Sequence, residues 1–203
     1  MLRPRQGVTF RLREKASVFL AELHPAADAT ARAGILATLR RRDHDATHHC
    51  SAWREGVPVA AWGSDDDGEP SGTAGAPMLR VLEGAGLTDC LAVCIRWFGG
   101  TKLGTGGLVR AYTEALQGAL EEARAGGALE AVRILRHGEI RVPPELAHLP
   151  FAVLGAFPDA VVEAPAHEAG ETVVAFALPP GREEAFAAAW RERSRGGSVA
   201  WKP

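Results

Sequence analysis

The spacing of apolar residues up to Gly127 predicts a domain in which strands and helices follow one another. Alternation of apolar and polar residues indicates strands, and apolar residues that recur every three or four positions indicate helices. In chain order the predicted elements are the strand Ser17–Leu23, the helix Ala26–Arg42, the strands Thr47–Arg54 and Val57–Trp62, the helix Pro77–Glu83, the strand Asp89–Trp97 and the helix Leu108–Ala123. Ala125-Gly126-Gly127 is typical of a helix C-terminus, so we expect the domain to end there.

Residues 128–203 follow a different order. The predicted elements are the strand Leu129–Val142, the helix Pro143–Gly155, the strands Ala160–Ala164 and Thr172–Leu178, the helix Arg182–Arg193 and the strand Ser198–Trp201. This βαββαβ order is that of the ferredoxin-like plait. The pattern therefore predicts an α+β protein of two domains, 1–127 and 128–203.

Charge and cysteine content narrow the possible functions. The formal net charge is −2, so the chain lacks the overall basic character of most nucleic-acid-binding domains, although local basic patches are compatible with it. No apolar run reaches the length needed to cross a bilayer, and we expect a cytoplasmic protein. The three cysteines, Cys50, Cys90 and Cys94, form no CxxC pair, so we expect reduced and mostly buried thiols.

An acidic, glycine-containing segment at Asp65–Gly75 (DDDGEPSGTAG) is the first candidate site. Asp66, Asp67 and Glu69 offer oxygen ligands of the kind that divalent cations prefer. The segment is not an EF-hand loop, because its sixth residue, counted from Asp65, is proline where that motif needs glycine. Two interpretations stay open: a polar binding surface, or a solvated turn whose carboxylates cap backbone groups or pair with arginine.

A second glycine-rich segment, Gly99–Gly107, precedes the helix Leu108–Ala123. Backbone N–H groups at a helix N-terminus form an anion site, and Lys102 and Arg110 add positive charge. The segment is neither a Walker A motif, which needs Gly-Lys-Ser/Thr, nor a dinucleotide fingerprint, because Val109 stands where the third glycine belongs. An anion or nucleic-acid backbone site and close strand–helix packing both remain possible.

His44, His48 and Cys50 form a third cluster, with His49 beside them. Zinc ligation is conceivable for these residue types, but the sequence offers no evident fourth ligand. The segment also crosses a predicted helix–strand junction. We therefore favour a structural role for these histidines.

Three blocks of sequence resemble the IMPACT/YigZ family: residues 44–50 (HDATHHC), residues 66–77 (DDGEPSGTAGAP) and residues 96–112 (RWFGGTKLGTGGLVRAY). The resemblance implies a first domain of the ribosomal protein S-five domain-2-like type. It also implies a ferredoxin-like second domain, as in bacterial members. Together the two look like the last two domains of elongation factor G.

The same resemblance implies a role near translation and supplies no catalytic residues. Eukaryotic relatives regulate the kinase response to amino-acid starvation by competing for the activator protein of that kinase. They do so with help from an extra RWD domain, so that partner is not carried over to this chain.

The leading hypothesis is a non-enzymatic, translation-linked binding protein without cofactor or metal. Its partner would be RNA, the ribosome or a translation-regulating protein, and no membrane. The expected binding surface is Asp66, Asp67, Glu69, Ser71, Thr73, Lys102, Thr105, Gly106, Gly107 and Arg110. One alternative is a metal-assisted hydrolase or transferase that uses Asp66, Asp67 and Glu69 with His48; another is a protein–protein regulator without a ligand.

Overall fold

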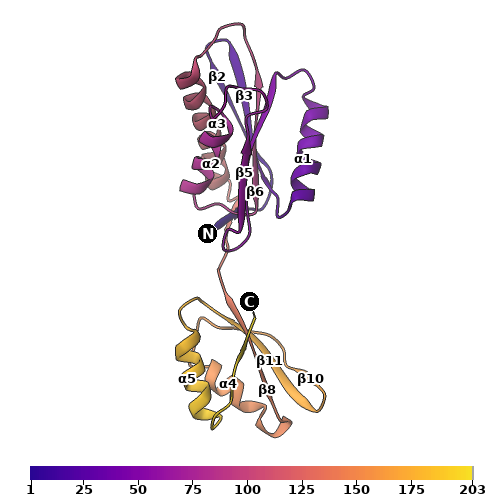
Figure 1. Cartoon of the computed structure of the whole chain (residues 1–203), viewed down its shortest axis with the longest axis vertical. Helices are drawn as coiled ribbons and strands as arrows, with labels where there is room; N and C mark the ends of the chain where they lie inside the picture. Colours follow the sequence, from indigo (N-terminus) through magenta and orange to yellow (C-terminus); the bar gives the residue numbers. More distant parts are fainter. Residues whose placement is uncertain (203) are drawn as a thin grey trace. The chain divides into compact units, whose positions relative to one another are not determined.

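The structure, a computed structural model, describes residues 1–202 (Figure 1). The chain forms two compact units, Met1–Val132 and the residues from Arg133 onward, each with a hydrophobic core of its own. The expected α+β class with two domains is confirmed. Each unit is described by itself below.

The division between the units lies beyond the predicted boundary at Gly127. The reason is a short strand, β7 (Leu129–Ala131), which pairs antiparallel with β1 (Leu2–Pro4) at the start of the chain. Apolar patterning merged β7 with the next strand, because the whole stretch Leu129–Val142 is rich in apolar residues. The structure separates them into two strands of different units.

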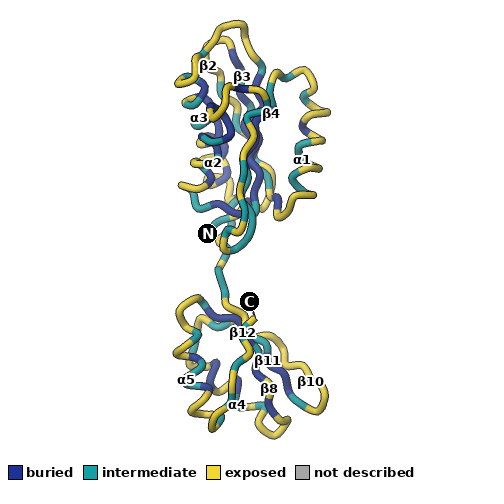
Figure 2. The backbone as a smooth tube through the Cα atoms, in the orientation of Figure 1, coloured by how far each residue is buried: buried dark blue, intermediate teal, exposed yellow. Residues whose placement is uncertain are grey.

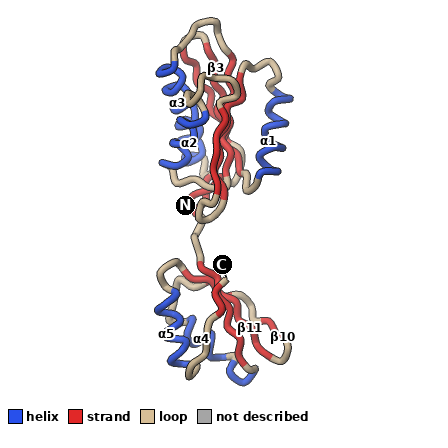
Figure 3. Tube along the Cα trace, in the orientation of Figure 1, coloured by secondary structure: helices blue, strands red, loops and turns tan. Residues whose placement is uncertain are grey.

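The first unit is built on a five-stranded antiparallel sheet in the order β2-β3-β6-β4-β5. Figure 3 shows the strands in red, between helices drawn in blue. The strands are β2 (Val8–Glu14), β3 (Ser17–Pro25), β4 (His48–Glu55), β5 (Ala61–Asp65) and β6 (Cys90–Trp97). The sequence analysis identified β3, β4 and β6, and it placed the start of β5 four residues too early, with the strand at Val57–Trp62. It missed β2, although the apolar and polar residues of that strand alternate. Strand β6 is central, which is why nearly all of its residues are buried.

Helices cover both faces of this sheet (Figure 1). Helix α1 (Ala29–Arg42) lies on one face, and α2 (Gly75–Gly84) and α3 (Thr105–Ala125) lie on the other. The alternation along β6 serves both faces: Leu91, Val93 and Ile95 pack in the α1 cluster, and Cys90, Ala92 and Cys94 pack in the α2–α3 cluster. The apolar residues that recur every three or four positions along α3 are buried (Figure 2): Leu108, Ala111, Tyr112, Ala115, Leu116, Ala119 and Ala123.

The three thiols lie in the same buried layer beneath α2 and α3 and are free, as expected. Burial raises the pKa of Cys50 and of Cys90 to about 12. A thiol with so high a pKa stays protonated at neutral pH and is a poor nucleophile. These cysteines therefore act as small apolar residues of the core.

The second unit has the predicted βαββαβ order. Its elements are β8 (Arg136–Val142), the short 3-10 helix η1 (Pro144–Leu146), α4 (His148–Leu154), β9 (Val161–Val162), β10 (Ala166–Glu168), β11 (Glu171–Leu178), α5 (Glu183–Arg193) and β12 (Ala200–Trp201). The sheet order is β10-β11-β8-β12, with β9 also paired to β11. The second strand of the motif is thus split into β9 and β10, where one strand was predicted.

The core of the second unit combines aliphatic residues with three buried aromatic residues. Phe176 on β11 and Phe186 on α5 lie with ring centroids 4.5 Å apart, and Trp190 is buried beside them.

None of the helices within residues 1–202 is long and apolar enough to span a membrane.

Gly118 on α3 tests the packing of α3 against β2. A Cβ atom at Gly118 would lie 2.4 Å from the ring of Phe10, whereas one at Gly34 on α1 would meet nothing within 4 Å. We expect Gly118→Ala to lower the free energy of unfolding by about 1–3 kcal/mol, because overpacking displaces the ring. Gly34→Ala should raise it by roughly 0.5–1 kcal/mol, because alanine favours the helix. Urea unfolding of both variants measures this, and equal effects would contradict the packing.

Candidate functional site

A buried carboxylate joins the two glycine-rich loops. Glu69 of the acidic loop accepts a hydrogen bond from Arg96 Nη1 at 2.6 Å and another from the Tyr112 hydroxyl at 2.7 Å. Arg96 lies near the end of β6, just before the second loop, and Tyr112 lies on α3, just after it. The sheet and α3 therefore hold the two loops together through one side chain.

This polar cluster lies almost entirely out of solvent. The side chains of Glu69 and Arg96 are 3% and 5% exposed. A buried charge is costly unless it is paired and hydrogen-bonded, so each of these charges needs the other. Arg96 Nη2 also donates to the Ser17 hydroxyl at 3.2 Å, whereas its Nε has no partner among residues 1–202.

Tyr112 and Cys50 complete the cluster. Burial, with nearby thiols adding, raises the pKa of Tyr112 far above its usual value. The phenol therefore stays protonated and acts as a donor to Glu69. The Cys50 Sγ lies 3.3 Å from the Tyr112 oxygen and 3.0 Å from the carbonyl oxygen of Asp66.

Asp66 organises the acidic loop from within. Its carboxylate accepts backbone N–H bonds from Gly72 at 2.7 Å, Ala74 at 3.0 Å and Gly75 at 2.8 Å. Burial alone would raise the pKa of Asp66, but the three donors together hold it below the usual range. Because these donors lead into α2, Asp66 caps the start of that helix although it lies outside it.

Asp67 connects the acidic loop to α1 and β4. One carboxylate oxygen accepts from Arg40 at 2.6 Å, and the other accepts from the backbone N–H of His49 at 2.6 Å. The residue has φ +43, in the left-handed region that few residues other than glycine, asparagine and aspartate adopt. The carboxylates of this loop thus cap backbone groups and pair with arginine, which was one of the two interpretations left open.

Of the three histidines, His48 makes side-chain contacts with the acidic loop. His48 Nδ1 lies 2.8 Å from the carbonyl oxygen of Asp67, and since a carbonyl only accepts, Nδ1 carries the proton. His48 Nε2 faces Glu69 at 3.9 Å. Burial, with the charge of Arg40 adding, lowers the pKa of His49. His44 is exposed on the loop before β4.

The described part of the chain, residues 1–202, contains no group of three or more His, Cys, Asp or Glu residues placed to hold a metal ion. Asp66, Asp67 and Glu69 face three different sets of partners rather than a common point. This arrangement does not favour the alternative of a metal-assisted enzyme that uses these carboxylates. Asp66 accepts from backbone N–H groups, Asp67 pairs with Arg40, and Glu69 pairs with Arg96.

The second loop combines close packing with an exposed helix N-terminus. A Cβ atom at Gly99 would lie 1.8 Å from the carbonyl oxygen of Ala16, so only glycine fits against the β2–β3 turn. Gly104, with φ +74, precedes α3 and offers no side chain to cap it. Thr105 and Gly106, the first residues of α3, are exposed, and the first N–H groups of a helix have no partner within it.

The predicted surface residues divide into two groups. Ser71, Lys102, Thr105, Gly106 and Arg110 are exposed, and Asp66, Asp67 and Gly107 are partly exposed. Glu69 and Thr73 are buried, with 8% and 5% exposed area, so the expectation that they face a partner is corrected. The Thr73 hydroxyl is used within the loop, where it donates to the carbonyl of Pro70 at 2.6 Å.

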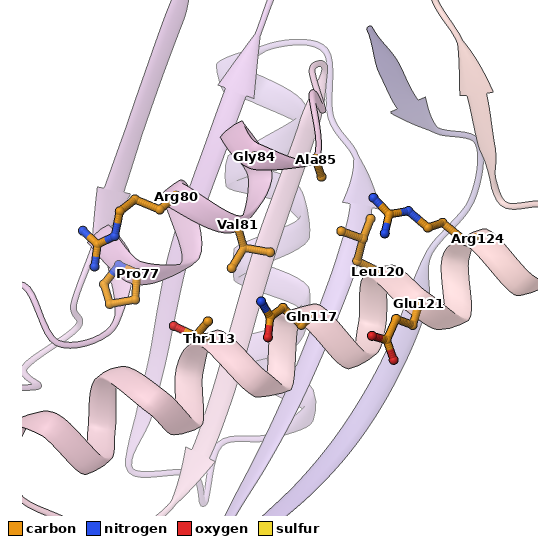
Figure 4. A pocket seen from close by; sticks show the side chains of 10 residues that line it. All are labelled: Pro77, Arg80, Val81, Gly84, Ala85, Thr113, Gln117, Leu120, Glu121 and Arg124. Atoms are coloured by element: carbon orange, nitrogen blue, oxygen red, sulfur yellow. The ribbon is translucent and has the colours of Figure 1, made fainter.

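A separate groove of about 490 Å³ runs between α2 and α3 (Figure 4). Arg80 lies toward one end of it and Arg124 toward the other, with Thr113 and Gln117 between them. The sequence analysis did not identify this groove. Its lining residues are spread over two helices and share no motif, so only the packing of the helices brings them together.

The fold and the bridged loops define a two-domain α+β protein whose first domain carries a loop cluster at one end of its sheet. The Impact N-terminal domain family matches residues 15–120, more than half of the chain. The chain therefore belongs to the IMPACT family, as the three sequence blocks indicated.

Several proteins are similar to it. The IMPACT family member YigZ of Escherichia coli K12 is 42% identical over 121 residues, which are 59% of this chain and 59% of that relative. An IMPACT family member from Thermus thermophilus is 40% identical over 134 residues, covering 66% of this chain and 69% of that protein. A crystal structure of a hypothetical protein covers 98% of this chain and 95% of its own, at 32% identity and a TM-score of 0.61.

Replacing Glu69 tests whether the loop cluster depends on its carboxylate. We expect Glu69→Ala to lower the free energy of unfolding by about 3–5 kcal/mol, because it leaves Arg96 buried without a counter-charge. Glu114 on α3 is exposed and serves as the control, where alanine should change stability by at most about 0.5 kcal/mol. Removing both charges, in Glu69→Leu/Arg96→Met, should recover most of the loss. A double variant no more stable than Glu69→Ala would contradict this account.

Asp66 gives the cluster a pH dependence of known sign. Its folded pKa lies below its unfolded value, so its contribution is present above the unfolded pKa and disappears as pH falls through the folded pKa. We expect Asp66→Ala to cost about 1–2 kcal/mol at pH 7, because the loop N–H groups lose their acceptor. The difference from the unmodified protein should shrink below about pH 4, near the ordinary pKa of aspartate. Unfolding curves between neutral and acidic pH measure it; a difference that grows on acidification would refute the role.

Proposed function

We propose that this protein is a translation-linked regulatory or binding protein that contacts RNA through the exposed parts of its two glycine-rich loops. The observation that carries the proposal is the N-terminus of α3, a helix of 21 residues that begins without a side-chain cap. Unsatisfied N–H groups and the helix dipole favour a negatively charged group at such an end.

Two cations lie close to this helix end in the sequence. Lys102 precedes α3 and Arg110 lies in its second turn; both side chains are exposed. Within residues 1–202, neither takes part in an ion pair, whereas Arg40, Arg42 and Arg96 of the same unit all do. Unpaired cations beside free backbone donors suit the phosphates of a nucleic-acid backbone.

Membership in the IMPACT family supports the translational setting that the sequence resemblance implies. RNA is abundant in that setting, and its phosphates match the charge of the α3 end. A ribosome-associated protein is the other partner that this setting offers, and the experiment below distinguishes the two. Action on the translation apparatus would place the protein in the cytoplasm. The proposal involves no catalytic step, metal or cofactor.

The double variant Lys102→Ala/Arg110→Ala tests this surface. We expect it to bind purified ribosomes at least about tenfold more weakly than the unmodified protein in co-sedimentation at low salt. Each phosphate contact favours binding by releasing counterions, and the variant loses two such contacts. Arg80→Ala/Arg124→Ala removes the same charge from the α2–α3 groove and should bind as before.

Crosslinking in the same samples identifies the partner. Crosslinks from the loops to ribosomal RNA support the proposal, and crosslinks to ribosomal protein alone would replace RNA with a protein partner. Unchanged ribosome binding by the Lys102→Ala/Arg110→Ala variant would remove this surface from consideration.

A further inference from the structure

The sheet face that carries α1 is only partly covered, because one helix lies on it where two lie on the other face (Figure 1). On the uncovered side, Arg11 is opposite Leu20, Arg13 is opposite Val18, and Val18 is opposite Trp97. Leu20 and Trp97 belong to the α1-side cluster, which places this row of residues on the α1 face. We call these five residues, on β2, β3 and β6, the β2–β3 patch.

The patch carries positive charge without an internal counter-charge. Arg11 and Arg13 are exposed and take part in none of the ion pairs found within residues 1–202. The acidic residue of β3 on this face is Glu22, which is buried and already bonded to Arg42 and to His24. The two arginines are therefore available to an anionic partner.

The patch also offers an apolar, aromatic surface beside these charges. Val18, Leu20 and Trp97 are each half-buried, so part of each side chain remains accessible. Neighbouring strands lie about 4.8 Å apart, which puts Arg13 and Trp97, two strands apart, roughly 10 Å from each other at Cα. Long side chains at this separation can contact a phosphate and a base of one nucleic-acid strand.

The patch adjoins the second glycine-rich loop. Lys15, in the turn between β2 and β3, is exposed, and Ala16 beside it packs against Gly99. A strand bound along Arg11 and Arg13 would therefore continue toward that loop. The patch and this loop together are longer than a binding site for a single phosphate needs to be. This favours a polymer over a free ion.

We propose that the β2–β3 patch binds single-stranded RNA, with phosphates on Arg11 and Arg13 and a base against Trp97. Stacking on an aromatic ring tolerates any base, so little sequence preference is expected. The proposal goes beyond the loop surface described above, since it uses other residues and stands if Lys102 and Arg110 bind nothing. The competing explanation is that the arginines only protect an edge strand from pairing with other chains.

The test measures fluorescence anisotropy of a labelled single-stranded RNA about 16 nucleotides long with the full chain. Arg11→Ala/Arg13→Ala should weaken binding about tenfold or more at low salt. It should also reduce the slope of log affinity against log salt by about 1.4, since each lost phosphate contact contributes roughly 0.7. Arg80→Ala/Arg124→Ala, with the same change in net charge, should leave both quantities as they are.

Trp97 provides a readout that charge alone does not move. Trp97→Leu should weaken RNA binding about fivefold or more, with an unchanged slope of log affinity against log salt. Trp97→Phe keeps an aromatic ring and should retain most of the affinity. If both Trp97 variants lose RNA affinity and unfolding measurements show that both are also less stable, the result would count against stacking.

Several outcomes would overturn the patch. The first is that the unmodified protein binds no RNA at low salt. The second is that the Arg80→Ala/Arg124→Ala control loses as much RNA affinity as Arg11→Ala/Arg13→Ala. The third is that only Lys102→Ala/Arg110→Ala loses RNA affinity. Self-association of Arg11→Ala/Arg13→Ala in light scattering, with RNA binding intact, would establish edge protection instead. Loss only in Arg11→Ala/Arg13→Ala would support the patch and leave the loop surface without support.

Discussion

The ion pair between Glu69 and Arg96 is the contact on which the candidate site depends. It is buried, and a buried pair contributes little to stability by itself but is expensive to break. Arg96 belongs to the central strand β6, and Glu69 belongs to the acidic loop, which Asp66 and Asp67 also anchor through their own hydrogen bonds. The pair ties the position of both glycine-rich loops to the rigid middle of the sheet.

In the two glycine-rich loops, the side chains that hold the loops in place differ from those that face solvent. Asp66, Asp67, Glu69 and Thr73 direct their side chains to backbone groups, to arginines or to Tyr112. The exposed residues of the two loops include the acidic Asp65, the hydroxyl residues Ser71 and Thr105, and the cation Lys102. The carboxylates of Asp66, Asp67 and Glu69 are thus used inside the protein, so the net charge of the acidic segment does not describe what the loops offer to a partner.

The sequence predicted elements well where one periodicity dominates. The stripe of α3 and the alternation of β6 are long and regular, and both are buried as expected. Strand β1 and strand β7 are three residues each, too short for a periodic signal, and their pairing joins residues at opposite ends of the unit. The loops were identified from composition, but the bonds of Glu69 to residues 27 and 43 positions away depend on the fold.

The pairing of β1 with β7 also fixes how the first unit is closed. The segment that leaves this unit is hydrogen-bonded in register to the beginning of the chain, from Leu2 opposite Ala131 to Pro4 opposite Leu129. Inserting or deleting one residue after Gly127 would shift that register and turn each side chain of β7 to the other face. The two ends of the first unit therefore hold each other in place, and freeing either strand would leave the backbone groups of the other without their partners.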